Sequence, residues 1–450
     1  MKTIISLVLF MILLYWIGLI YFSNKKKFRT VRSKDGQSYQ LSRNMYFVIF
    51  TVCTAPVFLG SLSLLKYGLW FTMILLLLFT AKIRAKFEAT TIMYLIFFLW
   101  LCYTMTYTSV PRDGLMMLVK FLLPIQFLWL GYSAINNEKE LIIFLKTVNI
   151  IACLWCFVIG GFSATFIPHL YVFSMSIFST YAAFADYLTS IFIVPILLYW
   201  LTKEKKYILC AFWMILSTVL QSVRTGMGGM MLVFVVAILL HHKWKAVPGV
   251  LFAGALFLGT ILFVPEVNEK FFGDKAGTVT STDIIENNAL SLDNIDTNGR
   301  NYTWEHILRK FYIGKESTGS GLGIAIRYLK DKSRYENEGA GLIHNDYVQL
   351  LAETGYIGLA LLILFYIFVI TKVISYILLR RTSSLTNLTG IMALSSMAGI
   401  AFCMYFDNVV SMSMQSMIMP YIYLGFFLKA IDLDRKNNIN QVSSFKNINV

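Results

Sequence analysis

Two arginines stand at positions where they could bind an anionic group. Arg224 lies in the segment QSVRTG (221–226), between two apolar runs, and three glycines follow within five positions. A cation beside small residues and exposed helix amides makes a site for an anion such as a phosphate. Arg300 precedes an amphipathic stretch, so its guanidinium would lie close to the surface on which that stretch rests. Alternatively, Arg224 only extends its charged group to the membrane interface, and Arg300 is only a solvated charge in a loop.

A histidine provides a candidate general base. His344 lies in GLIHNDY (341–347), immediately before a long apolar run, and histidine exchanges a proton near neutral pH. The alternative is a packing or capping residue, and Asn345 or Asp346 could equally cap the helix that follows. Glu353 comes two to three turns later in the same helix, where it could orient a partner or only pair with one.

Further charges within apolar runs are Lys120 and Asp186. Charges inside a membrane are costly, so each should face the interior of a helix bundle, either paired with the other or supporting a substrate. All six cysteines also fall in apolar runs, and no spacing of Cys, His, Asp or Glu matches a metal site. Neither a metal nor a cofactor is therefore expected.

The composition requires lipid as the main solvent of the chain. Of 450 residues, 57% are apolar and 14% are charged, and the mean hydropathy is +0.66. Such a chain cannot cover a soluble surface with polar groups. Because backbone hydrogen bonds must close within each span, an all-α polytopic integral membrane protein is predicted.

About 13 transmembrane helices are expected, since runs of roughly 20 apolar residues recur along the chain. The first run is Thr3–Phe22. The other runs cover residues 44–65, 68–81, 88–107, 114–133, 141–160, 182–201, 207–223, 226–241, 247–265, 348–371, 385–406 and 409–428.

The basic residues indicate how these spans are oriented. Only Lys2 precedes the first run, whereas a basic cluster within 25–34 follows it, so the N-terminus is predicted outside. Alternating the sides then places every basic cluster between spans, and the C-terminus, in the cytoplasm. The net charge of +15 therefore reflects membrane orientation, and a nucleic-acid partner is not expected.

The predicted organisation has four parts: spans 1–10 in residues 1–265, a large extracytoplasmic loop at 266–346, spans 11–13 in 347–428, and a cytoplasmic tail at 429–450. Within the loop, Asp283–Asn298 is acidic and rich in asparagine, which is typical of a mobile segment. Apolar residues repeat at i, i+3, i+4 and i+7 from Trp304 to Phe311, which predicts a helix resting on the membrane interface or on the bundle. Glycines at 319, 321 and 323 predict a tight turn.

Three segments together form a recognisable pattern. They are SVRTG (222–226), GRNYTW (299–304), and GSGLG (319–323) followed by HNDYVQLLAETG (344–355). This pattern resembles the O-antigen ligase and Wzy polymerase superfamily over about residues 205–370, and the last segment is the most specific. The sequence departs from the family at Thr225, where a small residue or glycine is common, and at Asp346, where Thr or Ser often follows His-Asn.

The resemblance implies a GT-C-like glycosyltransferase of the bacterial inner membrane that moves a glycan from an undecaprenyl-pyrophosphate carrier to an acceptor hydroxyl. The implied reaction inverts the anomeric carbon, needs no metal, and takes place on the extracytoplasmic side. Arg224 and Arg300 match arginines that hold the pyrophosphate, and His344 matches the proposed general base. Supporting roles are expected for Lys120, Asp186, Asn345 and Glu353.

The favoured function is polymerisation of lipid-linked repeat units for a capsule, O-antigen or exopolysaccharide, because no appended soluble domain or pilin-recognising feature is visible. A regulator of chain length would then be a further partner. The alternative within the superfamily is an O-antigen ligase that transfers glycan to lipid A core. From another class, a polysaccharide flippase also has this many spans, but such transporters rarely need an 80-residue outer loop, and no internal repeat is evident.

Overall fold

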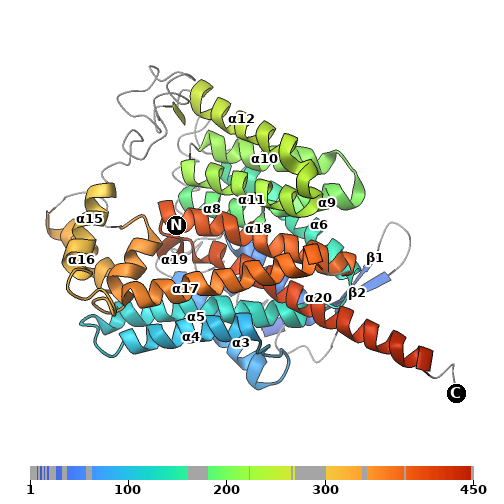
Figure 1. Ribbon diagram of the computed structural model, residues 1–450, viewed down its shortest axis with the longest axis horizontal. Coiled ribbons are helices and arrows are strands. Elements are labelled where there is room, and N and C mark those ends of the chain that lie inside the picture. Colours follow the sequence, from blue (N-terminus) through green and yellow to red (C-terminus); the bar gives the residue numbers. More distant parts are fainter. Residues whose placement is uncertain are drawn as a thin grey trace.

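The computed structural model describes residues 27–32, 38–56, 63–160, 181–221, 223–264, 267–268, 300–336, 342–379 and 382–446, and six isolated positions in the first apolar run. The predicted span Thr3–Phe22, the segment Asp283–Asn298 and Ser222 thus lie wholly or mostly outside the described residues. Helices dominate what is described (Figure 1). The exception is a hairpin of β1 (Lys27–Arg32) and β2 (Ser38–Ser42), which pair in antiparallel register.

Most helices belong to one bundle. In chain order they are α2 (Arg43–Thr54), α3 (Ser63–Phe79), α4 (Ala89–Thr104), α5 (Pro111–Ala134), α6 (Glu138–Trp155) with the π-helix η2 (Cys156–Gly160), α8 (Tyr181–Ile191), α9 (Ile193–Thr202), α10 (Lys206–Leu220), α11 (Arg224–His242) with the 3₁₀ helix η3 (Lys243–Ala246), α12 (Val247–Phe263), α17 (Asp346–Leu379), α18 (Ser384–Phe406), α19 (Val409–Met412) and α20 (Met414–Lys446). Two further helices, α15 (Arg300–Phe311) and α16 (Ile324–Glu336), lie together at the left end of the bundle in Figure 1.

By length and composition, seven helical stretches of the described chain can cross a membrane, and shorter apolar helices accompany them. The predicted fold class, an all-α polytopic membrane protein, is confirmed. The helices α8–α9 and α20 form the interior of the bundle, since 89% and 83%, respectively, of their most apolar 18-residue stretch is buried. By contrast, only 28% of the corresponding stretch of α17 is buried, so most of this helix faces lipid.

Several spans differ from their predicted extent. The run at 182–201 is present as one span, Tyr181–Thr202, with only a local interruption at Phe192 between α8 and α9, where Pro195 lacks the N–H of a regular helical bond. The run at 409–428 is broken at Ser413, between the four-residue α19 and α20. Within the predicted span 44–65, α2 already ends at Thr54, and α20 continues as a helix through most of the predicted tail.

The amphipathic helix expected around residues 304–311 is present as α15, and it rests on protein. Ile307 and Phe311 are buried in a small apolar cluster with α16 and α17, and Trp304 Nε1 donates to the carbonyl of Ile343 at 2.7 Å. Of the two supports that the pattern allowed, the bundle is therefore the one used.

The glycine turn between α15 and α16 exists because backbones approach each other closely. Gly319, Gly321 and Gly323 all have positive φ, and a Cβ on Gly319 would lie 2.5 Å from the carbonyl carbon of Glu353. The turn is also fixed by Tyr107, whose hydroxyl donates to the carbonyl of Thr318 at 2.5 Å. Partial burial raises the pKa of Tyr107 to about 12, so this donor keeps its proton. These glycines thus serve a chain reversal, as predicted.

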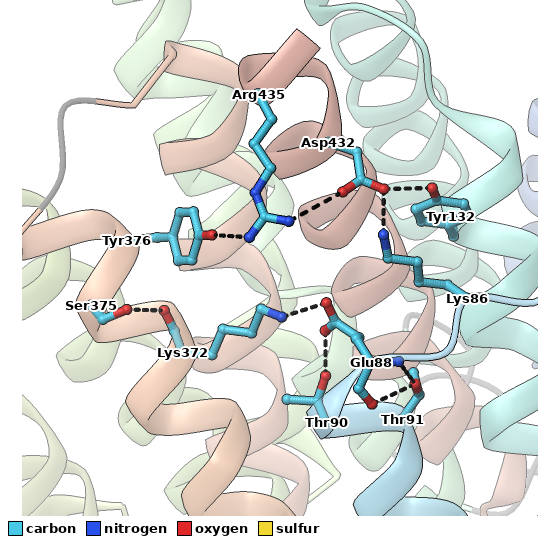
Figure 2. A network of polar contacts seen from close by, with 10 residues as sticks. All are labelled: Lys86, Glu88, Thr90, Thr91, Tyr132, Lys372, Ser375, Tyr376, Asp432 and Arg435. Atoms are coloured by element: carbon cyan, nitrogen blue, oxygen red, sulfur yellow. Dashed lines mark hydrogen bonds and ion pairs between the residues drawn. The ribbon is translucent and has the colours of Figure 1, made fainter. Parts of the chain in front are cut away.

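The opposite end of the bundle is held by two adjoining polar groups (Figure 2). In one, Asp432 of α20 accepts from Lys86 Nζ at 2.5 Å and from the hydroxyl of Tyr132 at 2.6 Å. In the other, Glu88 pairs with Lys372 of α17 at 2.5 Å. Together these contacts join the segment before α4 to α5, α17 and α20.

We predict that Asp432→Asn lowers the unfolding free energy of the purified protein by about 1–2 kcal/mol, because Lys86 would lose its charged partner while remaining mostly buried. Thermal unfolding in mild detergent measures the change. Glu204→Gln is the matched control, since the Glu204–Lys206 pair is about half exposed and should contribute almost nothing. Equal stability of the two variants would contradict this role for Asp432.

Candidate active site

The candidate site forms where α18 ends. Its last residue, Phe406, is followed by Asp407 and Asn408, which leave the helical conformation before α19 begins. Arg300, the first residue of α15, donates from Nη1 to the carbonyl oxygen of Phe406 at 2.6 Å. The carbonyls at a helix C-terminus carry partial negative charge and lack partners in their own helix, so a guanidinium satisfies and stabilises them. One candidate arginine is thereby anchored beside the end of α18.

His344 is held at the same helix end. Its backbone N–H donates to Asn408 Oδ1 at 3.0 Å, and its ring Nδ1 lies 3.2 Å from Asp407 Oδ1. Its φ of +53° is unusual for a residue other than glycine and costs about 1–3 kcal/mol, which the surrounding contacts must offset. With 22% of the side chain exposed, the ring is shielded yet reachable.

The tautomer of His344 follows from this contact. A carboxylate only accepts hydrogen bonds, so Nδ1 carries the proton and donates it to Asp407. Nε2 of the neutral ring is then a proton acceptor, as a general base requires. The arrangement can therefore take up a proton at Nε2 while the Asp407 carboxylate stabilises the resulting charge.

The structure separates His344 from the capping role that the sequence left open. Asn345 is the residue that caps α17, because its Oδ1 accepts from the backbone N–H groups of Tyr347 and Val348, each at 3.0 Å. Asp346 serves a different helix, accepting from the N–H of Val410 in α19 at 3.0 Å. Consecutive residues thus attach α17 to the loop after α18 without using the histidine ring as a cap.

Arg224 begins α11, and the first turn of that helix packs against the last turns of α18. The Sγ of Cys403, which lies one turn before Asp407, is 3.7 Å from the carbonyl oxygen of Thr225. A Cβ on Gly226 would lie 2.6 Å from the Cβ of Ala185 in α8. Gly226 therefore serves close packing of α11 against α8 and not an anion-binding loop. Arg224, the first residue of α11, lies toward the same end of α18 as Arg300 and His344.

The other intramembrane charges reach the neighbouring break between α19 and α20. Lys120 of α5 donates from Nζ to the carbonyl of Ser411 at 2.6 Å. Asp186 is fully buried in α8. Among the described ion pairs none joins these two residues, so the pair expected from the sequence is not formed. Lys120 instead satisfies a carbonyl that the broken helix leaves without a helical partner.

Glu353 lies away from the site. It is fully buried, and its carboxylate accepts from the backbone N–H of Ala325 at 3.2 Å and from Gln349 Nε2 at 3.3 Å. Ala325 is in the first turn of α16, so Glu353 satisfies one of the N–H groups that the start of this helix leaves without an intrahelical partner. In this structure it connects α16 to α17, and no contact with the candidate catalytic residues is described for it.

Asp407 and Asn408 are the residues that sequence reasoning missed. In the sequence they form only the short connection between the apolar runs at 385–406 and 409–428. Their signal was an acidic and an amide residue together at the outer end of a predicted span, the same boundary that holds His344. Nothing in their spacing along the chain relates them to a histidine 63 positions earlier.

No group of three or more His, Cys, Asp or Glu suited to a metal ion is found among the described residues. The ingredients of the site are guanidinium groups at a helix end and an imidazole with a free nitrogen for proton uptake.

Comparison with known proteins tests the family resemblance. The family model described as O-antigen ligase matches residues 209–363. The resemblance is confirmed. The matched segment, about a third of the chain, contains Arg224, Arg300, His344 and the whole of α15 and α16. No curated protein matches the chain.

We predict that Asp407→Asn slows the reaction in which His344 acts as general base by about 10- to 100-fold, since losing the carboxylate removes the group that sets the tautomer of the ring. The acid limb of the pH profile should also move to lower pH, because the protonated ring loses its stabilising charge. Asp331→Asn on α16, whose carboxylate pairs only at an exposed surface, is the control. An unchanged pH profile in a well-folded Asp407→Asn variant would exclude this positioning role.

Proposed function

We propose that the protein is a polymerase of undecaprenyl-pyrophosphate-linked oligosaccharide repeat units, a GT-C-like, metal-independent inverting glycosyltransferase. The observation that carries the proposal is the meeting of Arg300 and His344, two residues of the segment that matches the O-antigen ligase family, at the end of α18, which lies beyond that segment. That family supports a glycan-transferring membrane enzyme. The particular reaction and carrier are our inference.

The arginines suit the departing group of such a reaction. When the bond from the anomeric carbon to the carrier phosphate breaks, its electrons remain on the diphosphate oxygen. Arg224 and Arg300 would compensate this charge through charge-assisted hydrogen bonds, which are strong where water is scarce. Anchoring Arg300 through Phe406 keeps part of the guanidinium in place before substrate arrives.

His344 suits the incoming group. An acceptor sugar hydroxyl attacks the anomeric carbon on the face opposite the diphosphate and gives its proton to Nε2, so one displacement inverts that carbon. Asp407 would hold the ring and stabilise its positive charge. The proton then leaves to water, and the neutral base is restored.

The membrane arrangement follows from the same proposal. The site lies at the end of the bundle that bears α15 and α16, opposite the end that bears Lys86 and Arg435 (Figures 1 and 2). Basic residues favour the cytoplasmic side, so we assign the site to the extracytoplasmic face of the inner membrane. A lipid-linked donor would present its diphosphate at this boundary.

An O-antigen ligase is the second candidate, and the description of the matching family favours it. The two functions differ in the acceptor. Purified protein in liposomes, given lipid-linked repeat units on its outer side only, should lengthen them if it is a polymerase. A ligase should transfer glycan only when lipid A core is added, and a flippase should do neither.

We predict that Arg224→Ala and Arg300→Ala each abolish chain growth while the protein still inserts into membranes, because diphosphate charge would be left uncompensated. Lysine at either position should restore activity only in part, since it lacks the planar, bidentate fork. Arg309→Ala is the matched control, being an exposed arginine near the end of α15. Full activity in either alanine variant, scored by product length on gels, would remove that arginine from the site.

We predict that His344→Ala loses about 10²–10⁴-fold in transfer rate yet still binds the lipid-linked donor, because the arginines are assigned to the diphosphate. Acidification should slow the unmodified enzyme by protonating the base. His344→Asn should be as inactive as the alanine variant, with His242→Asn as a distant control. A fully active, well-folded His344→Asn protein would end the catalytic assignment.

A further inference from the structure

A ladder of aromatic side chains runs across α15 and α16. The rings of Tyr302 and His306 are stacked with centroids 6.3 Å apart and planes 20° apart, and those of His306 and Tyr328 with centroids 5.7 Å and planes 22° apart. Lys310 Nζ lies 3.8 Å from the centroid of the Tyr328 ring. Three nearly parallel rings thus form a row that begins in the first turn of α15, the helix that Arg300 opens.

This ladder is built rather than incidental. His306 Nε2 and the hydroxyl of Tyr328 lie 2.9 Å apart, within hydrogen-bond distance, and Phe311 packs edge-on against Tyr328 with centroids 5.4 Å apart. Phe311 belongs to the buried cluster beneath α15 and α16. The inner rings are therefore fixed, while Tyr302 at the end nearest Arg300 is 71% exposed.

The surroundings of Tyr302 favour a polar ligand over lipid. Its exposed neighbours on α15 are Asn301 and Glu305, both polar or charged. A helix face that enters lipid would present further apolar residues beside the tyrosine. A pyranose ring, in contrast, has one face of C–H groups and a rim of hydroxyls, so it suits the negative face of an aromatic ring flanked by hydrogen-bonding side chains.

We propose that the Tyr302–His306–Tyr328 ladder is a carbohydrate-binding subsite that holds sugars of the lipid-linked glycan beyond the one that reacts. The inference rests on the proposed glycosyl transfer and deepens it. Tyr302 is two residues from Arg300, about 3 Å along the axis of α15 but about 200° around it, so a glycan whose diphosphate lies at the arginine would reach this ring by passing around the first turn of the helix. The subsite would keep the chain in register with His344.

The test uses the full-length protein in nanodiscs and, as probe, the water-soluble oligosaccharide released from the carrier lipid of the producing cells. Saturation-transfer NMR and calorimetry measure its binding. Tyr302→Ala should weaken binding by about two- to tenfold, the range that one aromatic contact commonly contributes. Tyr302→Phe should bind like the unmodified protein because it keeps the ring. Ile313→Ala, at another exposed apolar residue just after α15, is the control and should change nothing.

Undiminished binding in Tyr302→Ala would overturn the subsite, and so would an equal loss in Ile313→Ala. If Tyr302 instead anchors the helix in lipid, Tyr302→Ala should bind the oligosaccharide as well as the unmodified protein does. Chain growth by the unmodified protein is measured separately. Elongation without any effect of Tyr302→Ala on binding would reject the ladder and leave the transferase. Ring-dependent binding without elongation would support the ladder and reject the transferase.

Discussion

The C-terminal end of α18 is the constraint around which the site is organised. A helix that ends near the membrane boundary leaves carbonyl groups that water satisfies poorly, so the protein must supply donors. Arg300 donates to the carbonyl of Phe406, and Asn408 receives the backbone N–H of His344. One contact that satisfies the helix end, and one with the residue just beyond it, therefore assemble the basic groups proposed to act on substrate.

The break that follows extends the same logic. Between α18 and α20 the chain makes only the short helix α19, which exposes further backbone groups in a poorly hydrated region. Asp346 accepts the N–H of Val410, and Lys120 donates to the carbonyl of Ser411. Irregular backbone at such a depth persists only where protein groups satisfy it. These charged residues consequently have a structural task close to the site, whatever they also contribute to substrate binding.

The helices α15 and α16 are positioned by backbone contacts with α17. Gly355, which interrupts the helical conformation of α17, and the glycine turn at 319–323 allow the two segments to touch. Glu353 then accepts from the first turn of α16. Because Arg300 and the aromatic ladder both belong to this unit, its attachment determines where they face the end of α18. A side chain at Gly319 or Gly355 would force the unit away from α17.

The sequence alone determined the membrane-embedded helical class, the helix around residues 304–311, the turn after it and the family resemblance, since each depends on local composition, periodicity or short motifs. Hydrophobic runs predict helices reliably because a segment that spans lipid must satisfy its backbone hydrogen bonds internally, which few structures other than a helix can do. The sequence could not give the partners of these residues. Asp407 reaches His344 across 63 positions, Lys120 bonds the backbone of Ser411 instead of Asp186, and Glu353 serves α16 instead of the site. These pairings arise only when packing brings distant helix ends together, because hydrogen bonds act over about 3 Å and carry no trace in local spacing.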